Sequence, residues 1–162
     1  MKNLYLAGGC FWCISAIYLD TDGVDDVVSG YCGGDKPNPT YEEVKSQTTG
    51  HRETILIVYD EKVASIKELL EIFYKNVDPY DFEGQFIDKG HSYTLAFYYQ
   101  DEEEKKIFED FIAEKEAKYG KKVAISVEPY KVFYKAECKH QKFCLFHPEE
   151  FEEELKESGR KK

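Results

Sequence analysis

Apolar runs and stretches of helical periodicity alternate along this chain of 162 residues. Residues 52–60, RETILIVYD, alternate in polarity and are rich in β-branched side chains, which predicts a strand. In residues 66–76 apolar side chains recur at helical spacing, which predicts a helix capped by Ser65. The same criteria predict further strands at residues 3–7, 24–34, 92–100 and 123–129 and further helices at residues 10–19, 41–47, 101–120 and 147–157.

The order of these elements predicts the α+β fold class. It runs βαββαβ followed by another αβ unit, so we expect helices packed on a mixed β-sheet, as in a ferredoxin-like two-layer sandwich. An irregular C-terminal extension follows the last predicted strand. We expect one domain in residues 1–157 and a frayed tail in residues 158–162. The predicted loop at residues 77–91 is long for a compact domain, and such loops are often functional.

The charge balance excludes one class of partner. The chain has 22 Lys and Arg against 32 Asp and Glu, a formal net charge of −10. Such a chain repels phosphate backbones, so nucleic acid is not an expected partner. No stretch approaches the roughly 18 apolar residues of a membrane helix, and the apolar run before Cys10 is short for a signal peptide. We therefore expect a cytoplasmic monomer that does not bind membranes.

The cysteines indicate a reducing environment and a chemical role. There are five of them: Cys10, Cys13, Cys32, Cys138 and Cys144. An odd number in a chain without a signal peptide favours reduced, catalytic or metal-bound cysteines over a disulfide framework.

The stretch GGCFWC, residues 8–13, is the first candidate for chemistry. Cys10 is predicted where a strand ends and a helix begins, and a helix N-terminus lowers the pKa of a thiol and favours the nucleophilic thiolate. Phe11 and Trp12 beside it are interpreted as an aromatic wall for a small apolar group. On its own, the stretch fits equally well with a buried structural cysteine among core aromatics.

The rest of the chain favours the catalytic interpretation. The motifs GCFWC, GYCGG (30–34), NPTYEEV (38–44), TTGHRE (48–53), VYD (58–60), DPYDFEGQFIDKGHSY (78–93) and FYKAECKHQKF (133–143) follow one another along the chain. In this order they resemble the motif series of the peptide methionine sulfoxide reductase A family, and within it the subset with Cys-x-x-Cys. The resemblance implies reduction of the S-epimer of methionine sulfoxide, either free or in oxidised proteins.

The resemblance also assigns roles to individual residues. It implies that Cys10 attacks the sulfoxide sulfur and becomes a sulfenic acid. The acid of the TGHRE motif, Glu53, is the implied proton donor, and burial is expected to raise its pKa. Phe11 and Trp12 match the pocket for the substrate methyl group.

Two tyrosines and one aspartate complete the implied catalytic set. Tyr41 of NPTY and Tyr93 of the GHSY segment match the phenols that hydrogen-bond the sulfoxide oxygen. Asp88 matches a carboxylate that helps to order the site. Taken singly, each tyrosine is as readily explained by packing and Asp88 by a turn.

Recycling is expected to need a second thiol, with thioredoxin or dithiothreitol as the reductant and neither a bound cofactor nor a metal. Cys13 is favoured as the resolving cysteine because it lies three residues from Cys10, within disulfide reach at a helix start. Cys144 and Cys138 are the alternatives, since their segment could fold back over the site.

Three other functions remain open from the residues. One is a general dithiol oxidoreductase built on Cys10 and Cys13, which leaves Tyr41, Glu53 and Tyr93 without a role. Another is a zinc module that combines these two cysteines with Cys138 and either His140 or Cys144. The last is a non-catalytic protein that binds methionine-rich partners.

Overall fold

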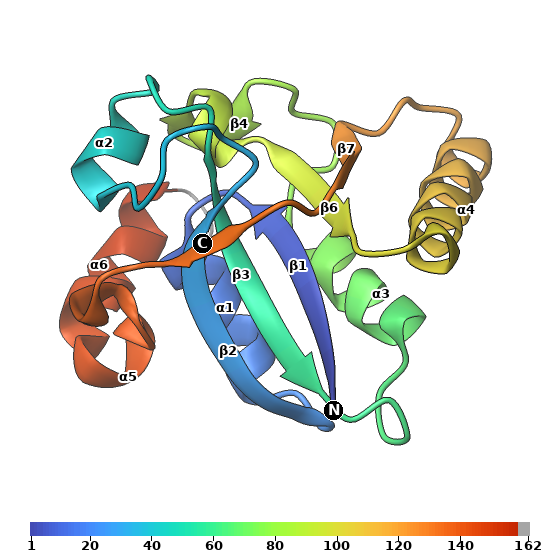
Figure 1. Cartoon of the computed structure of the whole chain (residues 1–162), viewed down its shortest axis with the longest axis horizontal. Helices are drawn as coiled ribbons and strands as arrows, with labels where there is room; N and C mark the ends of the chain where they lie inside the picture. The colour runs from blue at the N-terminus through green and yellow to red at the C-terminus, as the bar shows by residue number, and fades with distance from the viewer. Residues whose placement is uncertain (159–162) are drawn as a thin grey trace.

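A six-stranded mixed sheet is the centre of the structure, a computed structural model that describes residues 1–158 apart from the side chains of Cys144 and Ser158 (Figure 1). The strands are β1 (Lys2–Gly8), β2 (Val24–Cys32), β3 (Arg52–Tyr59), β4 (Gly84–Gln85), β5 (Asp88–Lys89), β6 (Leu95–Tyr99), β7 (Ile125–Pro129) and β8 (Phe133–Lys135). The helices are α1 (Phe11–Leu19), α2 (Tyr41–Lys45), α3 (Ile66–Asn76), α4 (Glu102–Tyr119), α5 (Phe143–Phe146) and α6 (Pro148–Ser158), with short 3-10 helices η1 (His91–Tyr93) and η2 (Cys138–His140).

The strand order is β7-β6-β1-β3-β2-β8, and β4 pairs with β5 in a separate hairpin. The β6–β7 pair is parallel, whereas β1, β2, β3 and β8 pair antiparallel with their neighbours. The sheet is therefore mixed, as predicted, and its central strands β1 and β3 lead directly into the residues of the candidate site.

One face of the sheet carries the main core. Leu4 and Leu6 of β1 and Ile55 and Ile57 of β3 are fully buried, and the alternation of side chains along a strand puts each pair on one face. They belong to a single cluster with apolar side chains of α1, α3 and α4, including Phe73. Helices cover this face, which confirms the predicted two-layer α+β arrangement.

The C-terminal third of the chain crosses the other face of the sheet. After β7 the chain runs over the sheet to its far edge, where β8 pairs with β2 (Figure 1). Tyr130 of this crossing stacks on Tyr5, with ring centroids 4.3 Å apart. The pairing of β8 brings the following residues, including α5 and α6, alongside α1.

Polar caps start helices α2 and α3 where the sequence predicts. The Ser65 hydroxyl accepts a hydrogen bond from the Glu68 N–H at 3.1 Å, and α3 has the predicted bounds. Thr40 and Glu43 form a reciprocal capping box at the start of α2. This box fixes the first residue of α2, Tyr41, which is a predicted site residue.

The structure differs from the sequence prediction in its irregular parts. The predicted loop at residues 77–91 contains the β4–β5 hairpin. The strand predicted at residues 92–100 begins only at Leu95, because η1 occupies the residues before it. The predicted irregular extension contains β8, η2 and α5 before α6. The predicted tail begins at Ser158, the last residue of α6, and residues 159–162 lie outside the described part of the chain.

Candidate active site

Cys10 lies between β1 and α1, at the position the sequence predicts. Gly9 adopts a left-handed φ of +85°, which only glycine adopts readily, and Cys10 then caps the helix. The Cys10 carbonyl accepts hydrogen bonds from the N–H groups of Cys13 and Ile14, at 3.1 and 3.2 Å. The thiol itself is buried, since Cys10 is only 6% exposed.

The expected low pKa of Cys10 is wrong for the substrate-free protein. The pKa of Cys10 lies well above the ordinary thiol value. The Cys13 side chain hydrogen-bonds to it, it is buried, and at the high pH at which it titrates Cys13 and Glu53 add negative charge nearby. These effects exceed the favourable influence of the helix N-terminus. Cys10 therefore rests as a neutral thiol, paired with Cys13.

Glu53 is buried next to Cys10. It lies on β3 with 1% exposure, and its Oε1 accepts a hydrogen bond from the Phe11 N–H at 3.1 Å. Burial raises the pKa of Glu53 to about 8, and the negative charge of Asp88 adds to the increase against the opposing hydrogen bond from Phe11. The carboxyl group therefore holds a proton at neutral pH, in agreement with the expectation from its motif.

Tyr41 and Tyr93 meet although they come from separate segments. Tyr41 begins α2, Tyr93 ends η1, and their side chains are hydrogen-bonded to each other. The pKa of each tyrosine is raised, first by burial and then by the charge of Glu53. Both hydroxyls therefore keep their protons and can donate to an oxygen acceptor near Glu53.

Asp88 lies on β5 of the hairpin, and its carboxylate faces the thiol. Ligand-type atoms of Cys10, Asp88 and Glu154 all lie within 4.8 Å of one another. Among the described residues, these three side chains form the group around Cys10 that could bind a metal ion. It does not contain Cys138 or His140, which the zinc-module interpretation requires.

Phe11 and Trp12 occupy different environments. Phe11 is fully buried and belongs to the main core, whereas Trp12 is half-buried and stacks on Phe143 with centroids 4.1 Å apart. Trp12 Nε1 also donates to Nδ1 of His140 at 3.1 Å. From the sequence both aromatics were predicted to form one side of the site. In the structure Phe11 is part of the core, and Trp12 is covered by the C-terminal segment.

Sequence reasoning missed several residues that hold the site together. His140 stacks on Tyr41 with centroids 4.4 Å apart. Glu137 accepts hydrogen bonds from the Tyr31 hydroxyl at 2.9 Å and from the Tyr41 N–H at 3.1 Å. The C-terminal residues that make these contacts all belong to the FYKAECKHQKF motif. The sequence identified this motif but did not indicate what its individual residues do.

The other cysteines differ in their access to Cys10. Cys13 is buried one helical turn along α1 and contacts Cys10. Cys32 is fully buried in the second core cluster, and burial raises its pKa to about 12. Cys138 is exposed on η2. Cys144 belongs to α5, and its side chain is outside the described part of the structure.

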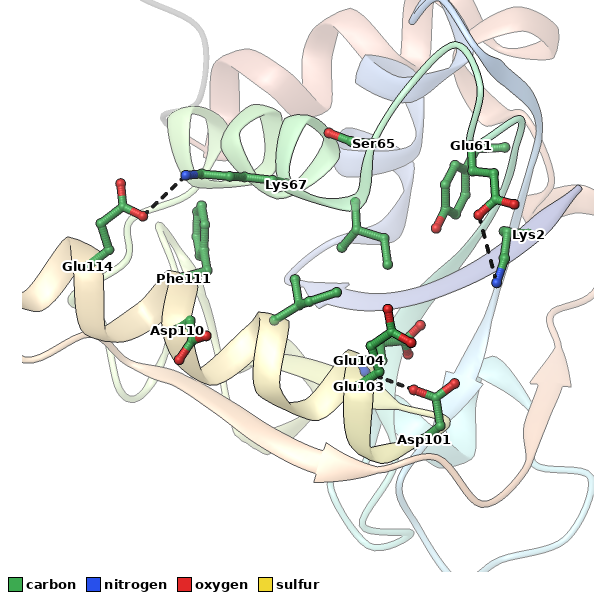
Figure 2. Close-up of a pocket in the computed structure, with 13 residues that line it drawn as sticks. Lys2, Glu61, Ser65, Lys67, Asp101, Glu103, Glu104, Asp110, Phe111 and Glu114 are labelled. Carbon is green, nitrogen blue, oxygen red and sulfur yellow. Dashed lines mark hydrogen bonds and ion pairs between the residues drawn. The ribbon is translucent and has the colours of Figure 1, made fainter.

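A separate hollow of about 490 Å³ opens between the start of α3 and α4 (Figure 2). Its charged rim is occupied by ion pairs, with Lys2 at 3.8 Å from Glu61 and Lys67 at 3.4 Å from Glu114. None of the predicted site residues lines it. The candidate site therefore lies outside this hollow.

Among the helices of residues 1–158, none is both long enough and apolar enough to cross a membrane.

Comparison with known proteins shows the family of the chain. The family model described as "Peptide methionine sulfoxide reductase" matches residues 2–162. Peptide methionine sulfoxide reductase MsrA of Picrophilus torridus is 47% identical over 148 residues, which cover 90% of this chain and 83% of that protein.

Solved structures show the same fold. Mxr1 from Saccharomyces cerevisiae in its reduced form has a TM-score of 0.86 and 31% identity, over 91% of this chain and 86% of that one. Mxr1 in complex with Trx2 has a TM-score of 0.59 and 22% identity, over 88% of this chain and 84% of that one. The chain therefore belongs to the peptide methionine sulfoxide reductase family.

Proposed function

We propose that this protein reduces the S-epimer of methionine sulfoxide, free or in oxidised proteins, with Cys10 as the nucleophile and Glu53 as the proton donor. The observation that supports this best is the pairing of a buried thiol with a buried carboxyl whose pKa is raised to about 8. Sulfoxide oxygen leaves only when protonated, so the site must hold both a nucleophile and an acid at neutral pH.

In the first step the Cys10 sulfur attacks the substrate sulfur while Glu53 protonates the oxygen. The oxygen passes to Cys10, which is oxidised by two electrons to a sulfenic acid, and the substrate leaves as the thioether methionine. The pKa of Cys10 is raised in the free protein, so its proton must leave the sulfur during the attack. The oxygen keeps the proton from Glu53 as the sulfenic O–H, and the thiol proton returns to Glu53, so the step releases no net proton. Tyr41 and Tyr93 donate hydrogen bonds to that oxygen.

The Asp88 carboxylate faces this centre and helps to keep Glu53 protonated, since its charge raises the pKa of Glu53. Trp12 and Phe11 are assigned to the apolar side of the site, which receives the substrate methyl. Trp12 stacks on Phe143, so its indole is part of an aromatic surface formed with α5.

In the second step we assign resolution to Cys13, within the Cys-x-x-Cys subset of the family. Its thiol attacks the sulfenic sulfur, a disulfide forms and water leaves. The contact between Cys13 and Cys10 supports this choice over Cys144 and Cys138. Two electrons and two protons from thioredoxin, or from dithiothreitol in vitro, then restore both thiols, so no resident cofactor is needed. The complex of Mxr1 with Trx2 supports a thioredoxin partner.

We further assign the catalysis to a single domain of residues 1–157, acting as a monomer in the cytoplasm. The free thiols of Cys10, Cys13, Cys32 and Cys138 fit a reducing compartment.

One experiment tests both steps. Reduced protein is incubated with excess S-epimer methionine sulfoxide and no reductant, methionine is counted, and disulfides are mapped by mass spectrometry. We expect about one methionine per chain and a Cys10–Cys13 bond. Cys10→Ser should give no methionine, and Cys13→Ser should give methionine without that bond. Cys138→Ser is the matched control and should behave as wild type.

Two alternatives have their own outcomes in this experiment. A bond from Cys10 to Cys144 or Cys138 would move the resolving role to the C-terminal segment. No methionine, together with reduction of a dithiol-exchange substrate, would favour a general oxidoreductase.

A further inference from the structure

Arg52 is a buried arginine that the proposed reaction does not use. It precedes Glu53 on β3 and is 7% exposed. Because side chains alternate along a strand, Arg52 points to the face of the sheet opposite to Glu53. A buried guanidinium is costly unless its charge is paired and its N–H groups are hydrogen-bonded. The partners of Arg52 therefore indicate what it does.

Three side chains hold the guanidinium in one orientation. Arg52 Nη1 donates to Glu128 Oε2 of β7 at 2.6 Å and to the Tyr98 hydroxyl of β6 at 3.1 Å. Arg52 Nε donates to the Thr94 hydroxyl at 2.8 Å, and this hydroxyl donates to the carbonyl of His91 at 2.6 Å, across η1. A planar guanidinium fixes the directions of its acceptors relative to one another. Arg52 therefore ties β3 to the end of η1.

The same two segments also meet on the reacting face of the sheet. The side chains of Tyr93 and Glu53 are hydrogen-bonded to each other, and they are the chain neighbours of Thr94 and Arg52. The pairs Arg52–Thr94 and Glu53–Tyr93 thus join β3 to the end of η1 twice, once on each face. Consecutive Cα atoms are only about 3.8 Å apart, so a shift of Thr94 away from Arg52 moves Tyr93 relative to Glu53.

We propose that Arg52 is a positioning residue for the reductase step. Through Thr94 it keeps the Tyr93 hydroxyl and the Glu53 carboxyl at the separation that the sulfoxide oxygen requires. The inference rests on the proposed function and adds to it a residue that does not touch substrate. One oxygen must accept a hydrogen bond from Tyr93 and a proton from Glu53 in the same step, so both groups must be aligned together.

The test measures single turnovers of reduced protein over a range of concentrations of S-epimer methionine sulfoxide. In Arg52→Met the side chain fills similar space without donors, so the maximal rate of methionine release should fall about 10- to 100-fold, as for a misplaced catalytic group. The half-saturating substrate concentration should stay within about twofold of wild type, because the lost alignment acts in the transition state. Arg52→Lys keeps the charge beside Glu128 but lacks the planar fork, and it should be slowed as well. A wild-type rate in Arg52→Lys would show that charge alone matters and would overturn the proposal.

Thr94 tests the same link from its other end and carries the test if the Arg52 variants do not fold. Thr94→Val removes the acceptor for Arg52 Nε and should be as slow as Arg52→Met. Thr94→Ser keeps the hydroxyl and should recover most of the lost rate. The double variant with Arg52→Met and Thr94→Val should lie within about twofold of the slower single variant, since both break one link. Additive losses would show that the two residues act separately, against the proposal.

A background without the Tyr93 hydroxyl shows whether Arg52 acts through it. Tyr93→Phe leaves no phenol to align with Glu53, so adding Arg52→Met should slow methionine release by no more than about threefold. If Arg52→Met has its full effect in this background, its role does not pass through Tyr93 and the assignment is wrong.

Lys115→Met is the matched control for lost stability. Lys115 pairs with Glu71 at 2.8 Å, and this ion pair has the same exposure as that of Arg52 and Glu128, 8% for the cation and 33% for the carboxylate. It joins α4 to α3 and not the segments that carry Glu53 and Tyr93. The melting temperatures of Lys115→Met and Arg52→Met should change by similar amounts, but Lys115→Met should keep the wild-type rate.

The remaining outcomes separate this role from the proposed function. Equal losses of rate in Lys115→Met and Arg52→Met would show a general effect of stability and would refute the positioning role. If wild type releases methionine and both Arg52→Met and Thr94→Val do so at the same rate, only the role of Arg52 fails. If wild type releases no methionine, the proposed function itself fails.

Discussion

At the scale of single residues, the protonation of Glu53 links the rate of reduction to pH. A general acid typically accelerates its step by about 10²–10⁴-fold, so Glu53→Gln should slow methionine release by that factor in single-turnover assays. The pKa of Glu53 is about 8. The wild-type rate should therefore decline as pH rises through that value, and the glutamine variant should lack this decline. An unchanged rate in the variant would mean that another group delivers the proton.

The same carboxyl group makes stability depend on pH. The pKa of Glu53 is raised from 4.5 to about 8 in the folded protein, so between these values the folded state binds a proton that the unfolded state does not. Its contribution to the free energy of unfolding is complete below pH about 4.5 and is lost as pH rises to about 8.

Glu53→Gln should therefore be more stable than wild type above pH 8, by up to a few kcal/mol, since one pKa unit corresponds to about 1.4 kcal/mol. Urea unfolding at pH 5 and pH 9 measures this difference. A variant that is destabilised equally at both pH values would show that the carboxyl proton is not what couples stability to pH.

At this scale the sequence predicts which residues of the motifs come together. Glu53, Tyr41 and Tyr93 lie near the Cys10 thiol or near one another, as their motifs imply. The pKa of Cys10 could not be predicted, because the helix N-terminus is a local feature whereas the burial and the approach of Glu53 are tertiary. Glu154 carried no signal, since an acid in the run EEFEEE looks like any solvated helix position.

At the scale of elements, periodic helices were predictable and short pairings were not. Helix α3 has its predicted bounds because a cap and an apolar stripe lie in the same short window. The β4–β5 hairpin has two residues per strand. That is too few for an alternation of polar and apolar residues to be recognised in the sequence. Strand β8 exists because it pairs with β2, a contact set by the whole fold.

One side chain couples two of these elements. Gln47, after α2, donates from Nε2 to the Ser92 hydroxyl at 2.8 Å and accepts from the Ser92 N–H at 2.9 Å. These bonds tie the segment that carries Tyr41 to η1, which carries Tyr93. Loss of these bonds in Gln47→Ala should lower the free energy of unfolding by about 1 kcal/mol per bond. It should also lower kcat by about tenfold, because Tyr41 and Tyr93 are no longer held in place together.

Gln47→Asn separates this coupling from backbone strain. Gln47 has a left-handed φ of +67°, which asparagine tolerates better than alanine, but the asparagine side chain is too short to reach Ser92 in the same way. We expect both variants to lose activity alike in steady-state assays. Full activity in Gln47→Asn would show that the bonds to Ser92 are not what positions the two tyrosines.

At the scale of the whole molecule, the last third of the chain encloses the site that the first two thirds build. Strand β8 anchors this segment at the edge of the sheet, and from there Glu137 bonds to Tyr31 and Tyr41 while Phe143 covers Trp12. The sequence predicted an irregular extension here, because its structure comes from contacts with β2 and α1 and not from local periodicity.

The β2–β8 contact offers a way to loosen this enclosure. A Cβ atom on Gly30 would lie 2.5 Å from the Tyr134 carbonyl oxygen and would overlap the Phe133 ring, so Gly30→Ala must push β8 away from β2. We expect a loss of about 1–3 kcal/mol in stability, typical of overpacking. The chain has a single tryptophan, and release of Phe143 should expose it, which shifts Trp12 emission to longer wavelength in the folded protein.

Gly120→Ala distinguishes this specific effect from general destabilisation. Gly120 ends α4 with φ of +64° and has nothing within 4 Å of an added Cβ, so alanine there costs about 1–2 kcal/mol through the backbone alone. Its Trp12 emission should match wild type. If both variants shift the emission equally, the covering of Trp12 depends on global stability. If Gly30→Ala alone shifts it and also lowers kcat, the edge strand β8 holds the C-terminal segment in place over the active site, far from the residues that carry out the reaction.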